Sequence, residues 1–203
     1  QIKADAVANG TWMKALNGND TNLNEEQWVD VRTKRFANFF GDWENDAENA
    51  SKVVDENGEP MVVYHGTENY FNEFQSKNSR ISGFFFTKNK EIANTYGGNI
   101  IASFVSLKNP FIVNAEGKRF TEDINVSMES HYHGEPIKNI TVGLPVDDIV
   151  SYVKNGKPKN SFIEIKNNNQ YDGVFLNDII DPSLTSSPSV SSDDIVAFSR
   201  NQL

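Results

Sequence analysis

The sequence contains no cysteine. This absence excludes a disulfide framework, a zinc–thiolate site and a cysteine nucleophile, and it is compatible with a reducing compartment. The sequence also has no apolar run long enough to span a bilayer, and its first residues lack the pattern of a signal peptide. Positive charge is scarce, and the formal net charge is −9 at pH 7. That balance argues against binding nucleic acid or anionic lipid through a broad basic face.

The residues that are present are sufficient for a packed domain. Of the 203 residues, 37% are hydrophobic and 11% are aromatic, which indicates one domain or one domain with an N-terminal extension. We predict a helical lead-in over residues 1–58, packed on a main domain over residues 59–203. Because the first residue is Gln rather than Met, we expect this sequence to be a processed or excised piece of a longer protein.

Two helical patterns occupy the lead-in. The first covers residues 3–16. The second begins at Asn24, which can cap the helix, while Gln27 can complete a capping box. An apolar and aromatic stripe over residues 28–40 continues this helix, and Gly41 is a natural stop. We interpret the stripe as a packing face rather than as a ligand site.

The most informative stretch is residues 61–96. A short β run, residues 61–64, ends at a His-Gly-Thr turn, and a second predicted strand, residues 83–86, carries three aromatic residues. A short helix then ends at Tyr96 before two glycines, and a third strand is predicted over residues 100–107. A packed core does not require a histidine, a glycine and aromatic residues to converge, whereas a pocket for a flat ligand with polar edges does.

The order Tyr-His-Gly-Thr, Gly-Phe-Phe-Phe-Thr and Ala-Asn-Thr-Tyr resembles the NAD-binding core of ADP-ribosyltransferases. It is most similar to the diphtheria-toxin and poly(ADP-ribose)-polymerase branch, whose signature is His, Tyr and Glu on three separate strands. The chain also resembles the ADP-ribosyltransferase domains in polyvalent proteins of phages and other mobile elements. That second resemblance rests on three runs, Phe40-Gly-Asp-Trp-Glu44, Gly58-Glu-Pro-Met-Val-Val-Tyr-His-Gly-Thr67 and Phe198-Ser-Arg-Asn-Gln-Leu203.

The resemblance implies a fold and a cofactor. The fold would be α+β, with two small packed antiparallel sheets around an NAD cleft and a helical lead-in before them. Residues 59–203 would be the catalytic domain. NAD would serve as co-substrate, and no metal would be needed.

The resemblance also assigns roles by position. His65 would hold the adenine-side ribose of NAD, Gly66 would bind the nicotinamide carboxamide through its backbone, and Tyr96 would stack on the nicotinamide ring. Two positions depart from the family pattern. Phe85 stands where the signature tyrosine normally lies, and it keeps the aromatic wall without the hydroxyl. Ala93 stands where relatives often have a serine, so that the carboxamide contact would be missing or made by a neighbour such as Thr67.

A third departure concerns the catalytic carboxylate, because the signature glutamate is replaced. Anchoring the last strand on Gln202 puts Asp194 in the position of the glutamate, and a register slip of one residue would put Asp193 there instead. Glu164, on a predicted strand over residues 161–166, is a poorer candidate. The carboxylate would stabilise the positive charge that develops on the ribose when the bond to nicotinamide breaks.

The middle of the chain carries one further candidate site. His131 and His133, with acidic residues nearby, are spaced as two zinc ligands can be, but the fold would have to supply a third. We favour an exposed loop over residues 128–135. We also predict an amphipathic helix over residues 146–153, strands over residues 171–176 and 193–198, and a loop over residues 183–192.

These inferences predict a mono-ADP-ribosyltransferase of toxin or effector type that transfers ADP-ribose to a host macromolecule, a protein rather than a nucleic acid. An NAD glycohydrolase and an inactive module that binds NAD or ADP-ribose are the alternatives. A nuclease toxin has little support in an acidic chain without clustered basic residues. We expect no membrane partner, and we expect action in the cytoplasm of a host or target cell. Delivery would be as part of a larger phage or secreted protein, with an immunity or carrier protein as a further partner.

Overall fold

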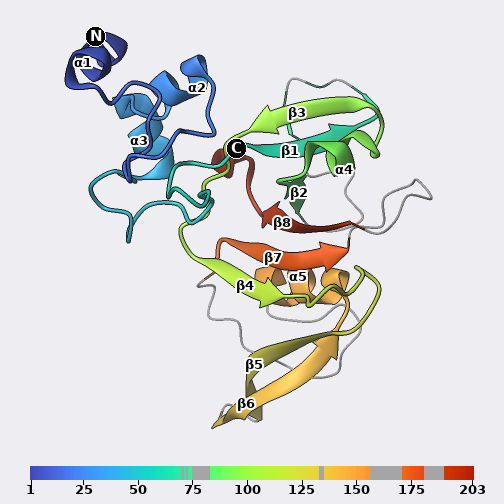
Figure 1. The fold of residues 1–203 in the computed structure, drawn as a ribbon. Coiled ribbons are helices and arrows are strands. Elements are labelled where there is room, and N and C mark those ends of the chain that lie inside the picture. Colours follow the sequence, from blue (N-terminus) through green and yellow to red (C-terminus); the bar gives the residue numbers. More distant parts are fainter. Residues whose placement is uncertain (70, 72, 75–82, 133–134, 156–170, 181–189) are drawn as a thin grey trace. The chain divides into compact units, whose positions relative to one another are not determined.

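The chain forms two compact units. The computed structural model describes residues 1–69, 71, 73–74, 83–132, 135–155, 171–180 and 190–203 (Figure 1). The first unit consists of Gln1–Val62, Phe104–Lys108 and Gln202, and the second of Val63–Ser103, Asn109–Asn201 and Leu203. The short segment 104–108, between two strands of the second unit in sequence, thus belongs to the first.

The first unit contains three helices among the described residues: α1 (Ile2–Asn9), α2 (Glu25–Asp30) and α3 (Lys34–Phe40). Helix α1 is shorter than predicted because Gly10 adopts the left-handed conformation, with φ 71°, and ends it. The capping box of Asn24 and Gln27 is confirmed, with both of its hydrogen bonds formed. The prediction of one helix through residue 40 is wrong, because Thr33 accepts a hydrogen bond from the N–H of Phe36 and starts α3.

Aromatic residues form the core of the first unit. The side chains of α2 and α3 pack with segment 104–108, and the ring centroids of Phe36 and Phe104 are 5.0 Å apart. Trp43 is buried, and its indole N–H donates to the carbonyl of Val31 at 2.9 Å. Trp28, Phe36 and Phe40 of the stripe over residues 28–40 belong to this buried cluster, so the interpretation of the stripe as a packing face is confirmed within the first unit.

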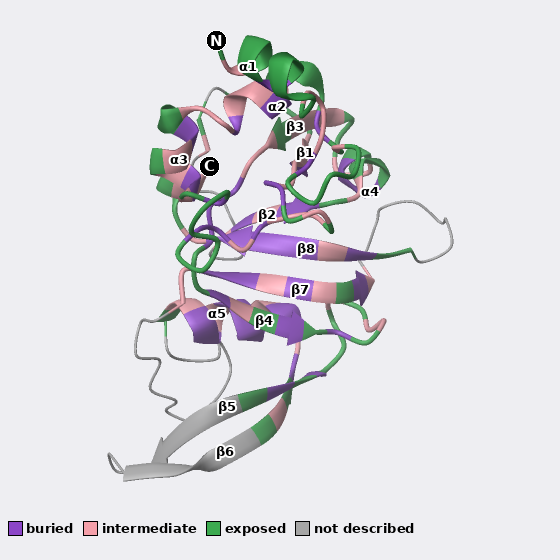
Figure 2. Ribbon diagram, turned by 60° about the vertical axis from the view of Figure 1, so that its left-hand side comes forward, coloured by how far each residue is buried: buried purple, intermediate pink, exposed green. Residues whose placement is uncertain are grey.

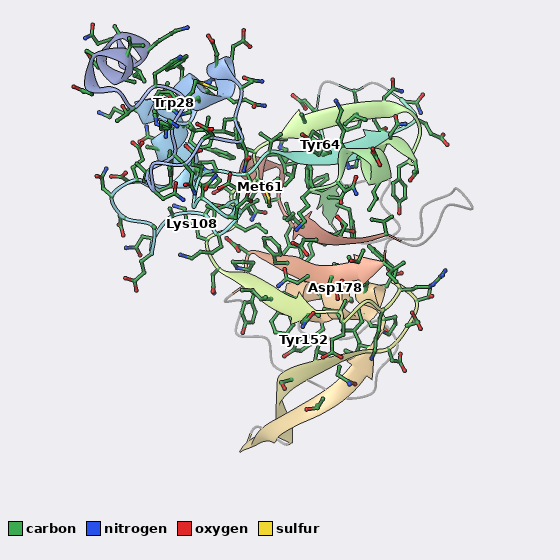
Figure 3. The ribbon with its side chains drawn as sticks, in the orientation of Figure 1. Trp28, Met61, Tyr64, Lys108, Tyr152 and Asp178 are labelled. Atoms are coloured by element: carbon green, nitrogen blue, oxygen red, sulfur yellow. The ribbon has the colours of Figure 1, made fainter. Side chains whose placement is uncertain are left out.

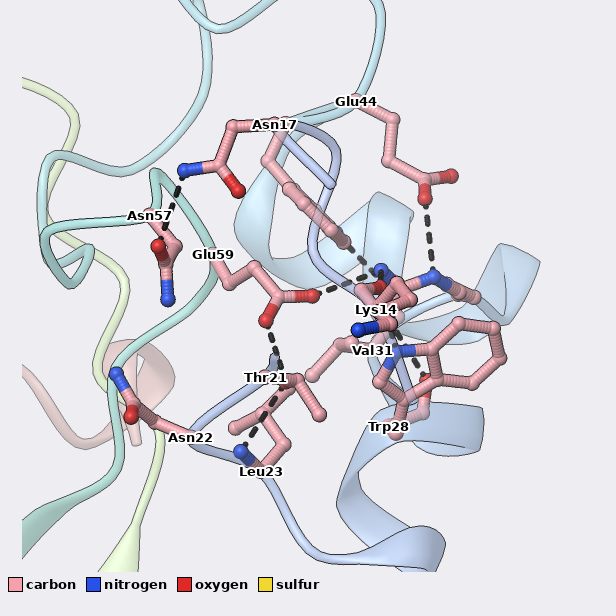
Figure 4. Close-up of polar contacts among 12 residues, drawn as sticks. Lys14, Asn17, Thr21, Asn22, Leu23, Trp28, Val31, Glu44, Asn57 and Glu59 are labelled. Carbon is pink, nitrogen blue, oxygen red and sulfur yellow. Dashed lines mark hydrogen bonds and ion pairs between the residues drawn. The ribbon is translucent and has the colours of Figure 1, made fainter. Parts of the chain in front are cut away.

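A charged network lies beside this core (Figure 4). The guanidinium of Arg32 covers the ring of Trp28 at 3.7 Å and forms ion pairs with Glu59 at 2.7 Å and with Glu44 at 3.2 Å. Thr21 donates its hydroxyl to Glu59, whose side chain is fully buried. Buried charges are tolerated only when they are paired in this way. The network therefore anchors Glu59, which lies shortly before the first strand of the second unit in sequence.

The second unit is built on a sheet of six strands in the order β3-β1-β2-β8-β7-β4. The strands are β1 (Val63–Thr67), β2 (Phe84–Thr87), β3 (Asn99–Ser103), β4 (Pro110–Asn114), β7 (Gly173–Ile180) and β8 (Ser191–Ala197). All neighbouring pairs are antiparallel except β4 and β7, which are parallel. A separate hairpin consists of β5 (Ile124–Tyr132) and β6 (Glu135–Leu144).

The architecture therefore mixes α and β elements, with one large and one small sheet. It differs from the expected pair of small antiparallel sheets, because β8 bonds to β2 along one edge and to β7 along the other, which joins six strands into one sheet. The exposed loop predicted over residues 128–135 is wrong, since these residues belong to β5 and β6 apart from the undescribed 133–134. Strand β3 ends at Ser103, earlier than predicted.

Helix α5 (Val146–Asn155) covers the core of the second unit and confirms the predicted amphipathic helix. Its buried residues, among them Ile149 and Val153, belong to one cluster with Leu176 of β7 and Val196 of β8. The buried parts of α5, β7 and β8 are purple in Figure 2. The rings of Tyr152 and Phe111 of β4 meet edge to face at 6.3 Å (Figure 3).

The remaining elements of the second unit are short. Helix α4 (Lys90–Asn94) precedes Tyr96, and a 3₁₀ turn covers Arg200–Gln202, whose last residue belongs to the first unit. The strands predicted near the carboxyl end are confirmed as β7 and β8. The predicted strand over residues 161–166, which carries Glu164, lies outside the described residues, as does most of the predicted loop over 183–192.

Candidate active site

Strand register places three side chains in a row on one face of the large sheet. Tyr64 of β1 is opposite Thr87 of β2, and Thr87 is opposite Asp194 of β8. Directly opposed residues of antiparallel strands project to the same face, and so does Phe85, two residues before Thr87. The central strands thus present aromatic, hydroxyl and carboxylate groups together.

A cavity of about 330 Å³ is bounded by this row. Helix α4 and the turn after it contribute Ala93 and Tyr96, and the connection between β4 and β5 contributes Phe120. The full lining is Tyr64, His65, Gly66, Phe85, Phe86, Thr87, Ala93, Tyr96, Phe120 and Asp194.

The cavity brings together most of the residues singled out from the sequence. His65, Gly66, Phe85, Tyr96 and Asp194 all line it. Thr67 is not among the lining residues, and its hydroxyl donates to the carbonyl of Asn69 at 3.1 Å.

Sequence reasoning missed Tyr64, Phe86, Thr87 and Phe120. Tyr64 and Thr87 had a usable signal, because Tyr64 ends the first predicted strand and Thr87 directly follows the second, and side chains alternate along a strand. Phe120 had none, because it comes from a connection whose path only the fold determines.

Gly66 is required by the approach of α4 to β1. A Cβ atom at this position would lie 1.8 Å from the carbonyl oxygen of Ala93 and 2.9 Å from the Cβ of Tyr96. No side chain fits in that space, so only glycine lets the two elements come this close. The position of Tyr96 at the cavity therefore depends directly on Gly66.

The ring of His65 is held by the sheet. Its Nδ1 lies 2.8 Å from the carbonyl oxygen of Phe85, and because a carbonyl only accepts, Nδ1 must carry the hydrogen. In the neutral ring this leaves Nε2 as a hydrogen-bond acceptor. The ring also contacts Phe74 and Phe86, with centroids 5.2 and 5.6 Å away, so that its orientation is fixed on several sides.

The two adjacent aspartates of β8 lie in different environments. Asp194 lines the cavity and is only 2% exposed. Asp193, which projects to the opposite side of the strand, forms an ion pair with Lys88 at 2.5 Å and accepts the backbone N–H of Asp178 at 3.0 Å. Asp178, which Figure 3 labels, lies where the register of β7 shifts, and its φ is 52°. Of the two acids, only Asp194 is placed at the cavity.

Comparison with known proteins adds a family to this geometry. The family of ADP-ribosyltransferases in polyvalent proteins matches residues 55–203. The chain belongs to this family. No curated protein and no solved structure matches the chain. ADP-ribosyltransferases use NAD as co-substrate and transfer its ADP-ribosyl group, and the matched residues include every residue that lines the cavity.

Within the ranges that the structure describes, no group of three or more histidine and carboxylate side chains is arranged to hold a metal ion. The helices described here are all too short or too polar to cross a membrane.

Proposed function

We propose that the chain is a mono-ADP-ribosyltransferase. It would cleave NAD between nicotinamide and ribose and transfer ADP-ribose to a macromolecule of a host or target cell, a protein rather than a nucleic acid. The observation that carries the proposal is the convergence of His65, Gly66, Tyr96 and Asp194 on one cavity, in a chain of an ADP-ribosyltransferase family.

The lining residues suit the parts of NAD. Tyr96 provides an aromatic face for the nicotinamide ring, and the backbone of Gly66 provides a donor and an acceptor for the carboxamide. His65 offers Nε2 as an acceptor for a hydroxyl of the adenine-side ribose, because its Nδ1–H is already given to Phe85. Phe85 adds an aromatic wall without a hydroxyl.

We assign the chemical step to Asp194. When the bond between C1′ and the nicotinamide nitrogen breaks, its electron pair leaves with nicotinamide, and positive charge develops on the ribose. A carboxylate that accepts the 2′-hydroxyl hydrogen stabilises that charge, and it does so strongly when solvent is excluded. The acceptor then forms the new bond to C1′, and Asp194 would take its proton.

The same proposal assigns the catalytic domain to residues 59–203 and a lead-in to residues 1–58. The family match over residues 55–203 supports this assignment. We place the activity in the cytoplasm of a host or target cell, reached as part of a larger phage or secreted protein. An immunity or carrier protein would be a further partner.

Release of nicotinamide from NAD by the purified chain tests the proposal, with and without a cell lysate and with the label on the ADP-ribose half. We expect release together with label in a protein band. Asp194→Asn should lower the rate at least about 100-fold, because it removes the charge that stabilises the transition state. Asp193→Asn is the matched control, on the same strand but away from the cavity, and should stay within about threefold, since it affects only an exposed ion pair.

Each other outcome has a distinct meaning. Release of nicotinamide without labelled acceptor would identify a glycohydrolase, in which water attacks C1′. Binding of NAD without release would identify a binding module, consistent with Phe85 and with aspartate in place of glutamate. An Asp194→Asn protein with full activity would move the catalytic role to Asp193 or Glu164.

A further inference from the structure

A buried pair of hydroxyl groups lies at the end of β2. The Oγ1 of Thr87 and the Oγ of Ser192 are 2.7 Å apart, and the two residues are 5% and 4% exposed. Ser192 precedes Asp194 by two residues on β8 and therefore projects to the same face as Asp194. Thr87 is itself the residue opposite Asp194 and lines the cavity.

The same threonine also contacts the residue that caps helix α4. Its Oγ1 accepts the backbone N–H of Asn89 at 3.2 Å. Asn89 caps α4 by accepting hydrogen bonds from the backbone N–H groups of Glu91 and Ile92. Helix α4 in turn leads to Tyr96. One hydroxyl thus links the strand that carries Asp194 to the start of the helix that leads to Tyr96.

A second link between β2 and β8 lies at the same strand end but has a different character. Lys88 and Asp193 form an ion pair at 2.5 Å, with side chains 49% and 27% exposed. An exposed ion pair of this kind constrains geometry weakly, because the lysine side chain is long and both charged groups are solvated. Two buried hydroxyls on short side chains have few alternative arrangements and interact in a low dielectric. The buried pair of Thr87 and Ser192 is therefore the link suited to fix the distance between β8, which carries Asp194, and helix α4, which leads to Tyr96.

We propose that Thr87 and Ser192 are positioning residues that set Asp194 relative to Tyr96, so that one NAD molecule meets both. The inference rests on the proposed use of NAD. Aspartate is one methylene shorter than the glutamate of the family signature, which leaves little tolerance for displacement. A misplacement of roughly 1 Å can cost about 100-fold in rate at such a site.

The test compares two probes of different length in calorimetry. Nicotinamide alone meets only the Tyr96 wall, whereas carba-NAD, an analogue that cannot be cleaved, also meets Asp194. Thr87→Val keeps the shape of the side chain and removes the hydroxyl, and Ser192→Ala removes its partner. Both variants should lower the affinity for carba-NAD about 5- to 10-fold, as expected for one lost buried hydrogen bond. Both should change the affinity for nicotinamide less than about twofold. Thr87→Ser, which keeps the hydroxyl, should bind both probes like the unmodified chain.

A matched control separates positioning from general destabilisation. Lys88→Met breaks the neighbouring exposed link and should leave both affinities unchanged. The inference would be overturned if Thr87→Val weakened the binding of both probes equally or left the binding of carba-NAD unchanged. It would also be overturned if Thr87→Ser bound carba-NAD as weakly as Thr87→Val, or if Lys88→Met weakened carba-NAD binding as Thr87→Val does.

The outcome is distinct from that of the proposed function. An unmodified chain that binds carba-NAD but releases no nicotinamide from NAD would contradict the proposed transferase activity. The ratio of the two affinities in the variants would still test the positioning role of Thr87 and Ser192. An unmodified chain that does not bind carba-NAD would overturn both.

Discussion

At the scale of single residues, Arg32 shows how the first unit holds charge inside. Its side chain is 9% exposed, stacks on Trp28 and pairs with Glu59 and Glu44. Removing one member of a buried pair typically costs about 3–5 kcal/mol, because the remaining charge loses its partner. Glu59 is fully buried and depends most on this arrangement, whereas Glu44 keeps 32% of its side chain exposed.

Glu44 gives the first unit a dependence on pH. Burial raises the pKa of its carboxyl above the ordinary value, and the Arg32 charge only partly opposes this, while Asp42 and Glu59 add to the increase in pKa. The folded state then holds the proton more tightly than the unfolded state. Its contribution to stability is present at low pH and is lost as pH rises above about 4.3, the ordinary value for glutamate.

We therefore expect the free energy of unfolding of Glu44→Gln, which does not titrate, to increase relative to that of the unmodified chain as pH rises from about 4 to 7. Urea unfolding at several pH values measures the free energy of unfolding of both proteins. The difference between them cancels the titration of the other groups. If the free energy of unfolding of the unmodified chain instead increased relative to that of the variant with rising pH, the attraction to Arg32 would affect the pKa of Glu44 more than burial does.

At the scale of elements, the packing of α4 on β1 decides where Tyr96 lies. We expect Gly66→Ala to displace α4, because its Cβ would overlap the carbonyl of Ala93, and overpacking of this kind costs about 1–3 kcal/mol. Thermal unfolding should show the loss, and calorimetry should show that nicotinamide binding is weakened.

The control for that variant is Gly143→Ala, on β6. Its added Cβ would lie 3.1 Å from the Cβ of Asp123, an exposed residue that can move. It should leave nicotinamide binding unchanged. Normal binding in Gly66→Ala would mean that α4 can shift without moving Tyr96.

At the scale of the whole molecule, the notable feature is segment 104–108, which belongs to the first unit although it lies between two strands of the second unit in sequence. Val105 and Leu107 are fully buried in the first unit. Ser51 donates its hydroxyl to the carbonyl of Val105, and the N–H of Lys52 donates to the carbonyl of Leu107. The family match begins at residue 55, so it includes this segment but not the partners that precede it.

A fragment of residues 55–203 should therefore be less stable than the full chain and prone to associate. Exposing a buried valine or leucine costs about 1.5–3 kcal/mol each. Size-exclusion chromatography and thermal unfolding of the fragment and the full chain provide the measurement. The fragment with Val105→Ser and Leu107→Ser is the control and should associate less. A monomeric fragment with the melting temperature of the full chain would contradict the prediction.

The sequence by itself determined the local features and the order of the motifs. Three features depend on neighbours within a few residues: the capping box at Asn24, the amphipathic α5 and the aromatic strand that ends at Thr87. Local sequence patterns therefore predict them without knowledge of the tertiary structure. The ordered motifs around His65 and Tyr96 also indicated the family that the comparison then showed.

Only the tertiary structure decided what depends on partners distant in sequence. The pairing of β8 with both β2 and β7 joined six strands into one sheet, and its register put Asp194 at the cavity and Asp193 at Lys88. Alternation along a strand separates two such neighbours, but which of them faces the cavity follows from pairing across more than 100 residues of chain. Phe120 enters the lining for the same reason, because no local pattern records where a connection passes.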